Sequence, residues 1–316
     1  MSADTTWQAY NAWGGYSLYH GPDGATRHRA YAVSFDRPYS YGAGSADFVG
    51  QERPLIALAE KLGLPVAFAA DTDLETTPGM LDASRAVISL GHDEYWSSQM
   101  RSQLLSARSG GTNLAFLGAN AIYRHIRLAA LPDGPHRLEI DYKDGSIDPL
   151  ARSNPSEGTW NWPSGPQPRD GDELTGDHYR CNPVHADLVL TSTDAWPLSG
   201  LGLRPGTHLP GLLGSEYDGL HRGTRVPTHI TSIARSPVTC GGRADHADIV
   251  YYTEANGAAG FDVGTSAWVC VLADHCGFPL TPNEMRIVEQ ITTNVLRAFS
   301  EGPAGLKHPV ATPSSG

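Results

Sequence analysis

The order of short apolar runs and amphipathic segments between residues 29 and 117 most constrains how this chain can fold. Uncharged runs rich in β-branched residues are typical of buried strands, and apolar residues at helical spacing are typical of surface helices. On these patterns we assign strands to 29–35, 64–70, 85–90 and 112–117, and helices to 51–63, near 80–83 and 98–108. This β-α-β-(α)-β-α-β order predicts a parallel sheet with right-handed crossovers.

The second half of the chain follows a less regular pattern. Residues 131–183 are rich in Pro, Gly, Asp and Trp, which is typical of a long insertion that covers a site. Strands are predicted at 187–190, 211–217, 229–233, 247–252 and 260–263, before a final helix at 282–299. We therefore expect one domain over 1–300, with parallel βα units in 1–130, the insertion in 131–183, strands and the final helix in 184–300, and a tail at 301–316.

Charge and composition exclude several classes of partner. The chain has 316 residues, a formal net charge of −11 and no run of Lys or Arg, so neither nucleic acid nor an anionic membrane is an expected partner. The first residues lack a signal-peptide pattern, and no apolar window is long enough to span a membrane. We expect a cytoplasmic protein that acts on a small molecule. Its four cysteines lack zinc-site spacing and are predicted to be free, mostly buried thiols.

The strand at 85–90 is followed by the segment Gly-His-Asp-Glu-Tyr-Trp-Ser at 91–97, which is rich in groups that bind protons or metals. Ser97 or Ser98 is a suitable N-cap for the next helix, so the segment is predicted to be a strand-to-helix turn. In an open α/β sheet such turns line the ligand crevice. His92, Asp93, Glu94 and Tyr95 are therefore candidate site residues. The alternative is that these polar side chains only cap the helix.

Further oxygen-bearing side chains lie at the ends of other predicted strands, and Asp36, Arg37, Tyr39, Asn120 and Glu216 belong to this group. The chain contains no nucleophile elbow, no cysteine at a strand-to-helix turn, and no phosphate-binding glycine loop after a strand. Phenolate and carboxylate oxygens are hard ligands that suit ferric iron better than zinc. A metal held in this way would lower the pKa of bound water, and such a site can hydrolyse an amide.

Several motifs give the chain a resemblance to a known family. They are YNAWGGYSLY (10–19), VSFDRPY (33–39), SLGHDEYWSSQMR (89–101), NLAFLGANAIYR (113–124), LLGSEYD (212–218), GFDVGTSAWVCVL (260–272) and QITTNVL (290–296). Together they resemble the C-terminal domain of the large subunit of N,N-dimethylformamidase and its relatives, over roughly residues 7 to 300. Members of that family often have a tryptophan where this chain has Arg124 or His125.

The resemblance implies a fold like that of the class I glutamine amidotransferases without their cysteine. The expected architecture is a mostly parallel sheet flanked by helices, with long loop insertions and additional strands in the C-terminal half. The resemblance also implies a mononuclear iron held by two tyrosines and one glutamate. By motif, Tyr95 and Tyr39 are the expected tyrosine ligands. Glu216 is the favoured glutamate, as a ligand or as a base, and Glu173 and Glu139 are the alternatives.

The leading hypothesis is a ferric iron enzyme that hydrolyses a small amide or formamide through a metal-activated water. The candidate catalytic residues are His92, Asp93, Glu94, Glu216, Arg37 and Asn120. One alternative is an iron-dependent oxidoreductase of a biosynthetic pathway. The other is a metal-free binding or structural domain with an inactive amidotransferase-like fold. The resemblance also raises the expectation of a homo-oligomer or of a small partner subunit.

Overall fold

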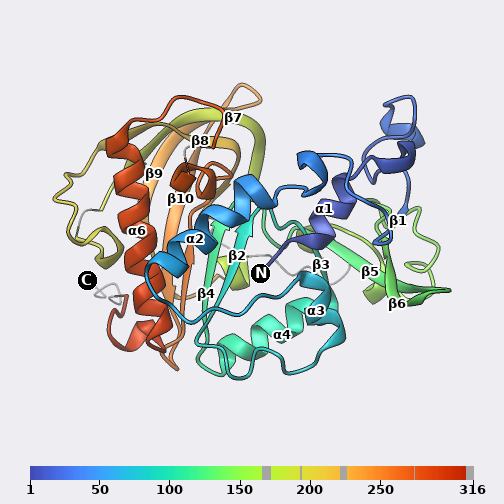
Figure 1. Cartoon of the computed structure of the whole chain (residues 1–316), viewed down its shortest axis with the longest axis horizontal. Coiled ribbons are helices and arrows are strands. Elements are labelled where there is room, and N and C mark those ends of the chain that lie inside the picture. The colour runs from blue at the N-terminus through green and yellow to red at the C-terminus, as the bar shows by residue number, and fades with distance from the viewer. Residues whose placement is uncertain (166–171, 193, 221–225, 274, 311–316) are drawn as a thin grey trace.

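A computed structural model describes residues 1–165, 172–192, 194–220, 226–273 and 275–310 of the chain. Within these residues the strands form one sheet of seven strands and one of four, called here the larger and the smaller sheet. The larger sheet curls into a half-barrel, and the smaller sheet lies beside it together with the N-terminal segment (Figure 1).

The larger sheet mixes parallel and antiparallel pairs in the order β2-β4-β11-β10-β9-β7-β8. Its strands are β2 (Ala86–Gly91), β4 (Asn113–Gly118), β7 (His178–Leu190), β8 (Thr207–Gly219), β9 (His229–Cys240), β10 (Arg243–Thr253) and β11 (Ala259–Asp262). β4 pairs in parallel with β2 and with β11, whereas the other neighbours are antiparallel. The long strands β7 to β10 therefore build an antiparallel surface beside a short parallel part.

The smaller sheet has the order β1-β6-β5-β3. Its strands are β1 (Ala32–Ser34), β3 (Tyr95–Ser97), β5 (Arg124–Leu131) and β6 (Gly134–Ile140). β5 and β6 form an antiparallel hairpin, and β3 pairs with β5 in parallel. Because β3 begins four residues after β2 ends, the segment between them joins the two sheets.

The helices are α1 (Asp4–Tyr10), α2 (Arg53–Lys61), α3 (Asp71–Thr76), α4 (Ser98–Ser109), α5 (Asp172–Thr175) and α6 (Pro282–Ser300). α4 begins where predicted, because the Ser97 hydroxyl accepts a hydrogen bond from the Met100 backbone N–H at 3.1 Å. α6 begins with a capping box between Thr281 and Glu284. Both boundaries follow from side chains that satisfy the free N–H groups of a first helical turn.

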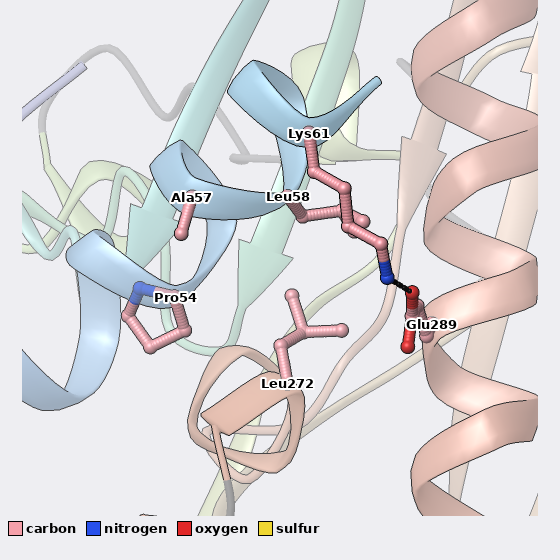
Figure 2. Close-up of a pocket in the computed structure, with 6 residues that line it drawn as sticks. All are labelled: Pro54, Ala57, Leu58, Lys61, Leu272 and Glu289. Carbon is pink, nitrogen blue, oxygen red and sulfur yellow. Dashed lines mark hydrogen bonds and ion pairs between the residues drawn. The ribbon is translucent and has the colours of Figure 1, made fainter.

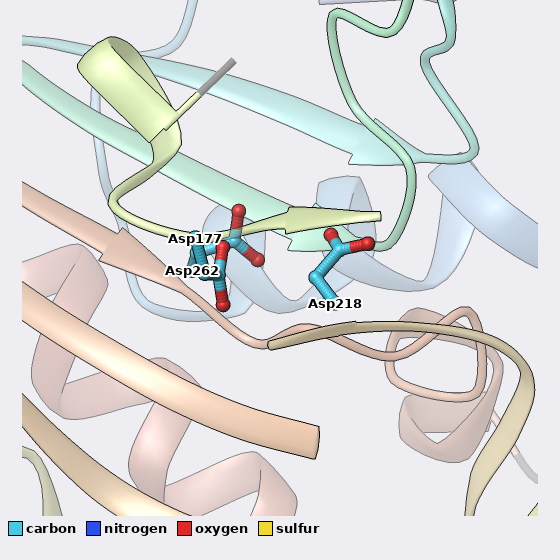
Figure 3. Close-up of side chains that lie close together, drawn as sticks. All are labelled: Asp177, Asp218 and Asp262. Carbon is cyan, nitrogen blue, oxygen red and sulfur yellow. The ribbon is translucent and has the colours of Figure 1, made fainter. Parts of the chain in front are cut away.

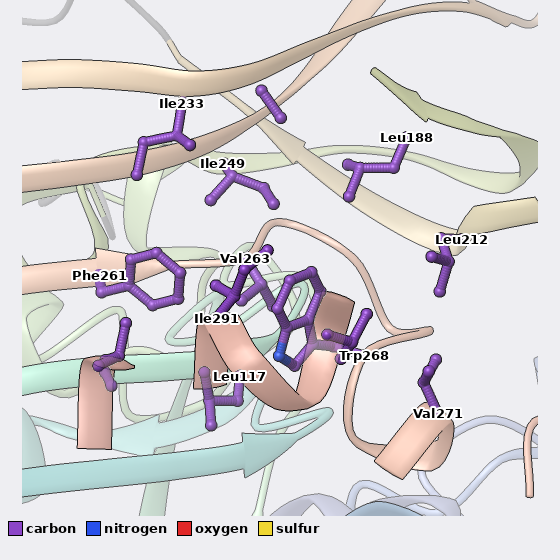
Figure 4. Packing of buried hydrophobic residues seen from close by; sticks show 14 of the residues in the cluster. Leu117, Leu188, Leu212, Ile233, Ile249, Phe261, Val263, Trp268, Val271 and Ile291 are labelled. Atoms are coloured by element: carbon purple, nitrogen blue, oxygen red, sulfur yellow. The ribbon is translucent and has the colours of Figure 1, made fainter. Parts of the chain in front are cut away.

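The main core lies between the larger sheet and the helices α2 and α6 (Figure 4). Leu117, Phe261 and Ile249 come from neighbouring strands and are buried against Ile291 of α6. Trp268 is fully buried among them, and its indole N–H donates to the Thr292 hydroxyl at 3.1 Å. A second core packs α3 and α4 against the opposite side of β2 and β4. This part of the sheet is covered on both faces, as its continuous apolar runs predict.

The predicted amidotransferase-like fold with a mostly parallel sheet is wrong. The expected strand at 64–70 forms only an isolated bridge between Ala70 and Ser2, and β1 lies in the smaller sheet, antiparallel to β6. The parallel part is thus limited to β2, β4 and β11, and most pairs in the larger sheet are antiparallel. The prediction failed because local patterns identify strands without identifying their partners, and strand partners here are often distant in sequence.

The prediction of free cysteines is also wrong. Disulfides join Cys181 to Cys240 and Cys270 to Cys276. The first links β7 to β9, which are neighbours in the larger sheet although the two cysteines are 59 positions apart. Cys270 is buried in the main core, as its apolar surroundings predict. Throughout the described parts of the chain, every helix is too short or too polar to cross a bilayer.

A close approach between β2 and β4 gives a first testable prediction. Gly118 pairs with Gly91, and a Cβ added at Gly118 would lie 1.4 Å from the Gly91 carbonyl oxygen. We expect Gly118→Ala to push the strand ends apart and to lower the free energy of unfolding by about 1–3 kcal/mol in urea denaturation. The control is Gly134→Ala, whose added Cβ would meet only the Arg137 side chain at 3.4 Å. Equal stability of the two variants would contradict the prediction.

Candidate functional site

The segment between β2 and β3 carries three of the predicted site residues. The Glu94 carbonyl accepts hydrogen bonds from the backbone N–H groups of Tyr123 and Arg124, at 3.0 and 2.8 Å. The Asp93 side chain is fully buried and accepts from the Ser89 hydroxyl at 2.5 Å and from the Trp96 indole at 2.7 Å. Asp93 therefore fixes the segment from within the core. His92 and Glu94 belong instead to a separate polar network.

His92 lies between two carboxylates. Its Nε2 atom is 3.1 Å from Glu216 Oε2 and 3.4 Å from Glu94 Oε2, and Asn120 Nδ2 lies 3.3 Å away. Burial disfavours the charged imidazole, but Glu216 and Glu94 outweigh this effect and raise the pKa of His92 to about 9. Burial alone would raise the pKa of Glu216, but its interaction with His92 and a hydrogen bond from Asn182 at 2.7 Å lower it.

Three tyrosine hydroxyls meet near the Glu94 carboxylate. Tyr10 donates to Glu94 Oε2 at 2.9 Å, and the Tyr19 hydroxyl lies 3.1 Å from the same oxygen and 2.8 Å from the Tyr10 hydroxyl. Tyr95 donates to the Tyr19 hydroxyl at 2.6 Å and accepts a hydrogen bond from Lys143. Burial, followed by the charge of Glu94, raises the pKa of Tyr10 and of Tyr19 above its usual range. Both phenols are thus neutral unless a cation joins them.

Two cationic side chains complete this network. Arg124 Nε lies 3.3 Å from the second Glu94 oxygen, Oε1, and its guanidinium also donates to Asn161. The Lys143 ammonium lies 3.5 Å from the centre of the Tyr19 ring. Burial lowers the pKa of Lys143 to about 8, although Glu94 and Asp141 oppose this shift. Arg124 therefore balances the charge of Glu94 directly, and Lys143 lies against the neighbouring tyrosines.

The structure brings together five of the residues singled out from the sequence: His92, Glu94, Tyr95, Asn120 and Glu216. They reach this group from different elements. Asn120 follows β4 in a left-handed backbone conformation with φ 62°, which turns its side chain toward His92. Glu216 comes from β8.

Other predicted residues lie elsewhere. Tyr39 packs edge-on against Trp7, in a small apolar cluster separate from the one that contains Tyr95. Asp36 pairs with Arg137, and Glu173 pairs with Arg101 at 2.7 Å. Glu139 is fully buried on β6, where burial and Asp141 raise its pKa well above its usual range. Tyr39 and Tyr95 therefore belong to different clusters, and the contacts described above for Glu173 and Glu139 do not include His92.

Arg37 supports the site from a distance. Its guanidinium donates to the backbone carbonyl oxygens of Gln8 at 3.0 Å and Tyr16 at 2.7 Å. These two acceptors flank Tyr10 in the N-terminal segment, which also carries Tyr19. Arg37 is therefore a positioning residue for the two phenols.

Sequence reasoning missed Tyr10, Tyr19, Asn182, Arg124 and Lys143 as members of the network. The available signal was the aromatic, glycine-broken motif at 10–19, because such a segment must pack against the protein. No local pattern indicates that it packs against Glu94.

Two of the pockets lined by described residues differ in their relation to the polar network. One, of about 140 Å³, lies between α2 and α6 and is bordered by the ion pair of Lys61 with Glu289 at 2.6 Å (Figure 2). None of its six lining residues is a predicted site residue. The other, of about 180 Å³, is lined by His125, Trp160 and Trp162 among others, and it shares Asn161 with the Arg124 contact described above. Of these two pockets, the second shares Asn161 with the polar network.

Comparison with known families gives a match over most of the chain. A family described as "N,N-dimethylformamidase beta subunit-like, C-terminal" matches residues 1–278. The chain belongs to this family. The predicted resemblance is thus confirmed, and no curated protein matches the chain. The residues matched to the N,N-dimethylformamidase beta subunit-like family include Tyr10, Tyr19, His92, Glu94 and Glu216.

The chemistry of the network suits a hard cation such as ferric iron. In an octahedral shell with bonds of about 2.0–2.1 Å, neighbouring ligand oxygens lie about 2.9 Å apart. The oxygens of Tyr10, Tyr19 and Glu94 lie 2.8 to 3.1 Å from one another. Phenolate and carboxylate oxygens are also the ligand types that hard cations prefer. The oxygens of these three side chains therefore fit the iron that the motif resemblance implies.

Proposed function

We propose that this chain binds one ferric iron through Tyr10, Tyr19 and Glu94 and hydrolyses a small amide or formamide. The observation that carries the proposal is the meeting of two phenol oxygens and one carboxylate oxygen within 3.1 Å, beside His92. Membership of the N,N-dimethylformamidase beta subunit-like family supports the amide as substrate class. In this proposal Tyr10 and Tyr19 take the place of Tyr39 and Tyr95 as the two tyrosines.

When bound, the iron would supply a Lewis acid that polarises the amide carbonyl and lowers the pKa of water. The residues around it have separate tasks. His92 would hold or move a proton at Nε2, where Glu216 stabilises the imidazolium at 3.1 Å. Asn120 would hold Glu216 beside this imidazole, because its side chain hydrogen-bonds that carboxylate and lowers its pKa.

Access to the site is on the side of Tyr10. The Tyr10 residue is 37% exposed although its hydroxyl contacts Glu94, whose side chain is only 3% exposed. A small substrate would thus approach along the tyrosine rings and meet Arg124, which is able to bind a carbonyl or carboxylate oxygen. We further propose, because the family description names a beta subunit, that the enzyme works within an assembly of subunits.

The test is elemental analysis and a visible spectrum of protein purified without chelators, followed by assays with formamides and other small amides. We expect about one iron per chain, a charge-transfer colour of tyrosinate on ferric iron, and release of amine and acid. Iron-free, colourless protein without amidase activity would contradict the proposal. Oxygen uptake on addition of substrate, without amide cleavage, would contradict the hydrolytic part alone.

A further inference from the structure

A second group of oxygens lies apart from the phenols, at the ends of three strands. Asp177 directly precedes β7, Asp218 lies near the end of β8, and Asp262 is the last residue of β11 (Figure 3). One carboxylate oxygen from each lies within 4.8 Å of the other two. The three residues are 0%, 2% and 0% exposed. Chain segments far apart in sequence thus place three acids in one buried space.

The charge of this group is poorly matched by its surroundings. Within the described residues, the hydrogen bonds to the three carboxylates come from the backbone N–H groups of Asn120, at 2.9 and 3.0 Å, and Gly264, at 2.8 Å. Both oxygens of Asp177 and one of Asp262 are buried there without a hydrogen-bond donor from another residue type, and the two carboxyls contact each other. Asp177 is aimed into the cluster, so its oxygens face the other two acids (Figure 3). Buried anions in this arrangement require either a cation or bound protons.

We infer that Asp177, Asp218 and Asp262 bind a hard divalent cation of the calcium class. Carboxylates without histidine or cysteine select oxygen-seeking ions over zinc or copper. Calcium bonds to oxygen at about 2.3–2.6 Å, so ligand oxygens on opposite sides of the ion lie about 5 Å apart. Separations within 4.8 Å fit such a shell, in which backbone carbonyls or water complete the coordination.

This cation would stabilise the side of the candidate site formed by Asn120 and Glu216. Asp218 accepts both hydrogen bonds from the Asn120 backbone N–H, and the Asn120 side chain lies 3.3 Å from His92. Glu216 is two residues before Asp218 on β8 and carries the carboxylate nearest to His92. The ion would thus join β7, β8 and β11 at the point where two partners of His92 are held. Its role is structural and does not depend on the proposed iron.

The test uses the full chain after removal of loosely bound ions with a chelator. Calcium is then added in equilibrium dialysis and in thermal unfolding, with magnesium and zinc compared. We expect one calcium ion per chain and a higher unfolding temperature. Asp177→Asn should weaken calcium binding by at least roughly tenfold. The control is Asp187→Asn, which removes the same charge from an exposed position on β7 beside His208 and should leave calcium binding unchanged.

The outcomes distinguish a cation bound by the three aspartates from protons shared among their carboxyl groups. If wild-type protein binds no calcium and its unfolding temperature does not respond to it, the inference is overturned, whatever the variants do. An Asp177→Asn variant more stable than calcium-saturated wild type would also overturn it, since that result indicates relief of repulsion among acids. Iron content is measured in parallel, so failure of this site and failure of the proposed iron site are distinguishable.

Discussion

Glu94→Gln is expected to abolish iron binding and to lower amide hydrolysis by at least roughly 100-fold. Glu94 Oε2 meets the hydroxyls of Tyr10 and Tyr19, and Oε1 faces Arg124. A glutamine keeps the shape of this side chain but removes the negative charge that a ferric ion requires. It also places an amide group where the phenols now find acceptors. The measurement is iron content and visible absorbance of the purified variant, together with its turnover of the best amide substrate.

Glu173→Gln is the matched control for this change. Glu173 also pairs with an arginine, Arg101, but it lies outside the phenol network. We expect this variant to retain iron and most of its activity. If Glu173→Gln loses iron while Glu94→Gln retains it, the proposed glutamate ligand is wrong.

Phenylalanine substitutions distinguish the proposed tyrosine ligands, Tyr10 and Tyr19, from those implied by the motif resemblance, Tyr39 and Tyr95. The proposed set predicts that Tyr10→Phe and Tyr19→Phe lose the charge-transfer colour. Tyr39→Phe should keep it, because Tyr39 packs against Trp7 in a separate apolar cluster. Loss of colour in Tyr39→Phe with full colour in Tyr10→Phe would favour the ligands implied by the motif resemblance. Tyr95→Phe should retain iron, since the Tyr95 hydroxyl donates to Tyr19.

Asp148→Asn is expected to lower the free energy of unfolding by about 3–5 kcal/mol, more than Gly118→Ala. Asp148 is fully buried, and its oxygens lie 2.6 and 3.1 Å from the Arg127 guanidinium. It also accepts from the Thr159 backbone and hydroxyl and from the Leu150 backbone. The neutral amide would leave Arg127 without its counter-charge. Urea denaturation at neutral pH measures the difference.

The same carboxylate predicts a pH dependence. Burial would raise the pKa of Asp148, but Arg127 and the backbone donors outweigh it and lower the pKa to about 2, below the unfolded value of 3.8. The stabilisation is therefore complete above pH 3.8 and is lost as the pH falls toward 2. The stability gap between wild type and Asp148→Asn should narrow over this range. Asp144→Asn, an exposed acid in the same loop, should show no comparable gap at any pH.

Local sequence patterns predicted individual elements of this fold better than their arrangement. β2, β4, α4 and α6 were located because apolar period, capping residues and glycine breaks act within a few positions. The partners of the strands depend on contacts across the whole chain. β11, for example, pairs with β4, which lies about 145 residues earlier in the chain. A short apolar run such as 64–70 also resembles a strand whether or not a sheet edge is available to it.

Local sequence patterns also predicted only part of the candidate site. His92, Asn120 and Glu216 were singled out because they lie at or just beyond the ends of predicted strands, where polar side chains collect. Tyr10 and Tyr19 approach Glu94 across 84 and 75 positions, and their segment has no regular period. Only packing of the N-terminal segment, which Arg37 holds through backbone carbonyls, brings them there. The motif resemblance implied Tyr39 and Tyr95 as ligands, whereas the proposed ligand set contains Tyr10 and Tyr19.

The way the segment between β2 and β3 joins the two sheets has a consequence for folding order. The tyrosine partners of Glu94 lie in the first half of the chain, whereas Glu216, the partner of His92, lies on β8 in the second half. During synthesis, the proposed iron ligands can therefore come together before His92 has Glu216 as its partner. On the proposed function, a nascent chain would be able to bind iron before it could hydrolyse an amide. Reactivity would then begin only when the late antiparallel strands have assembled.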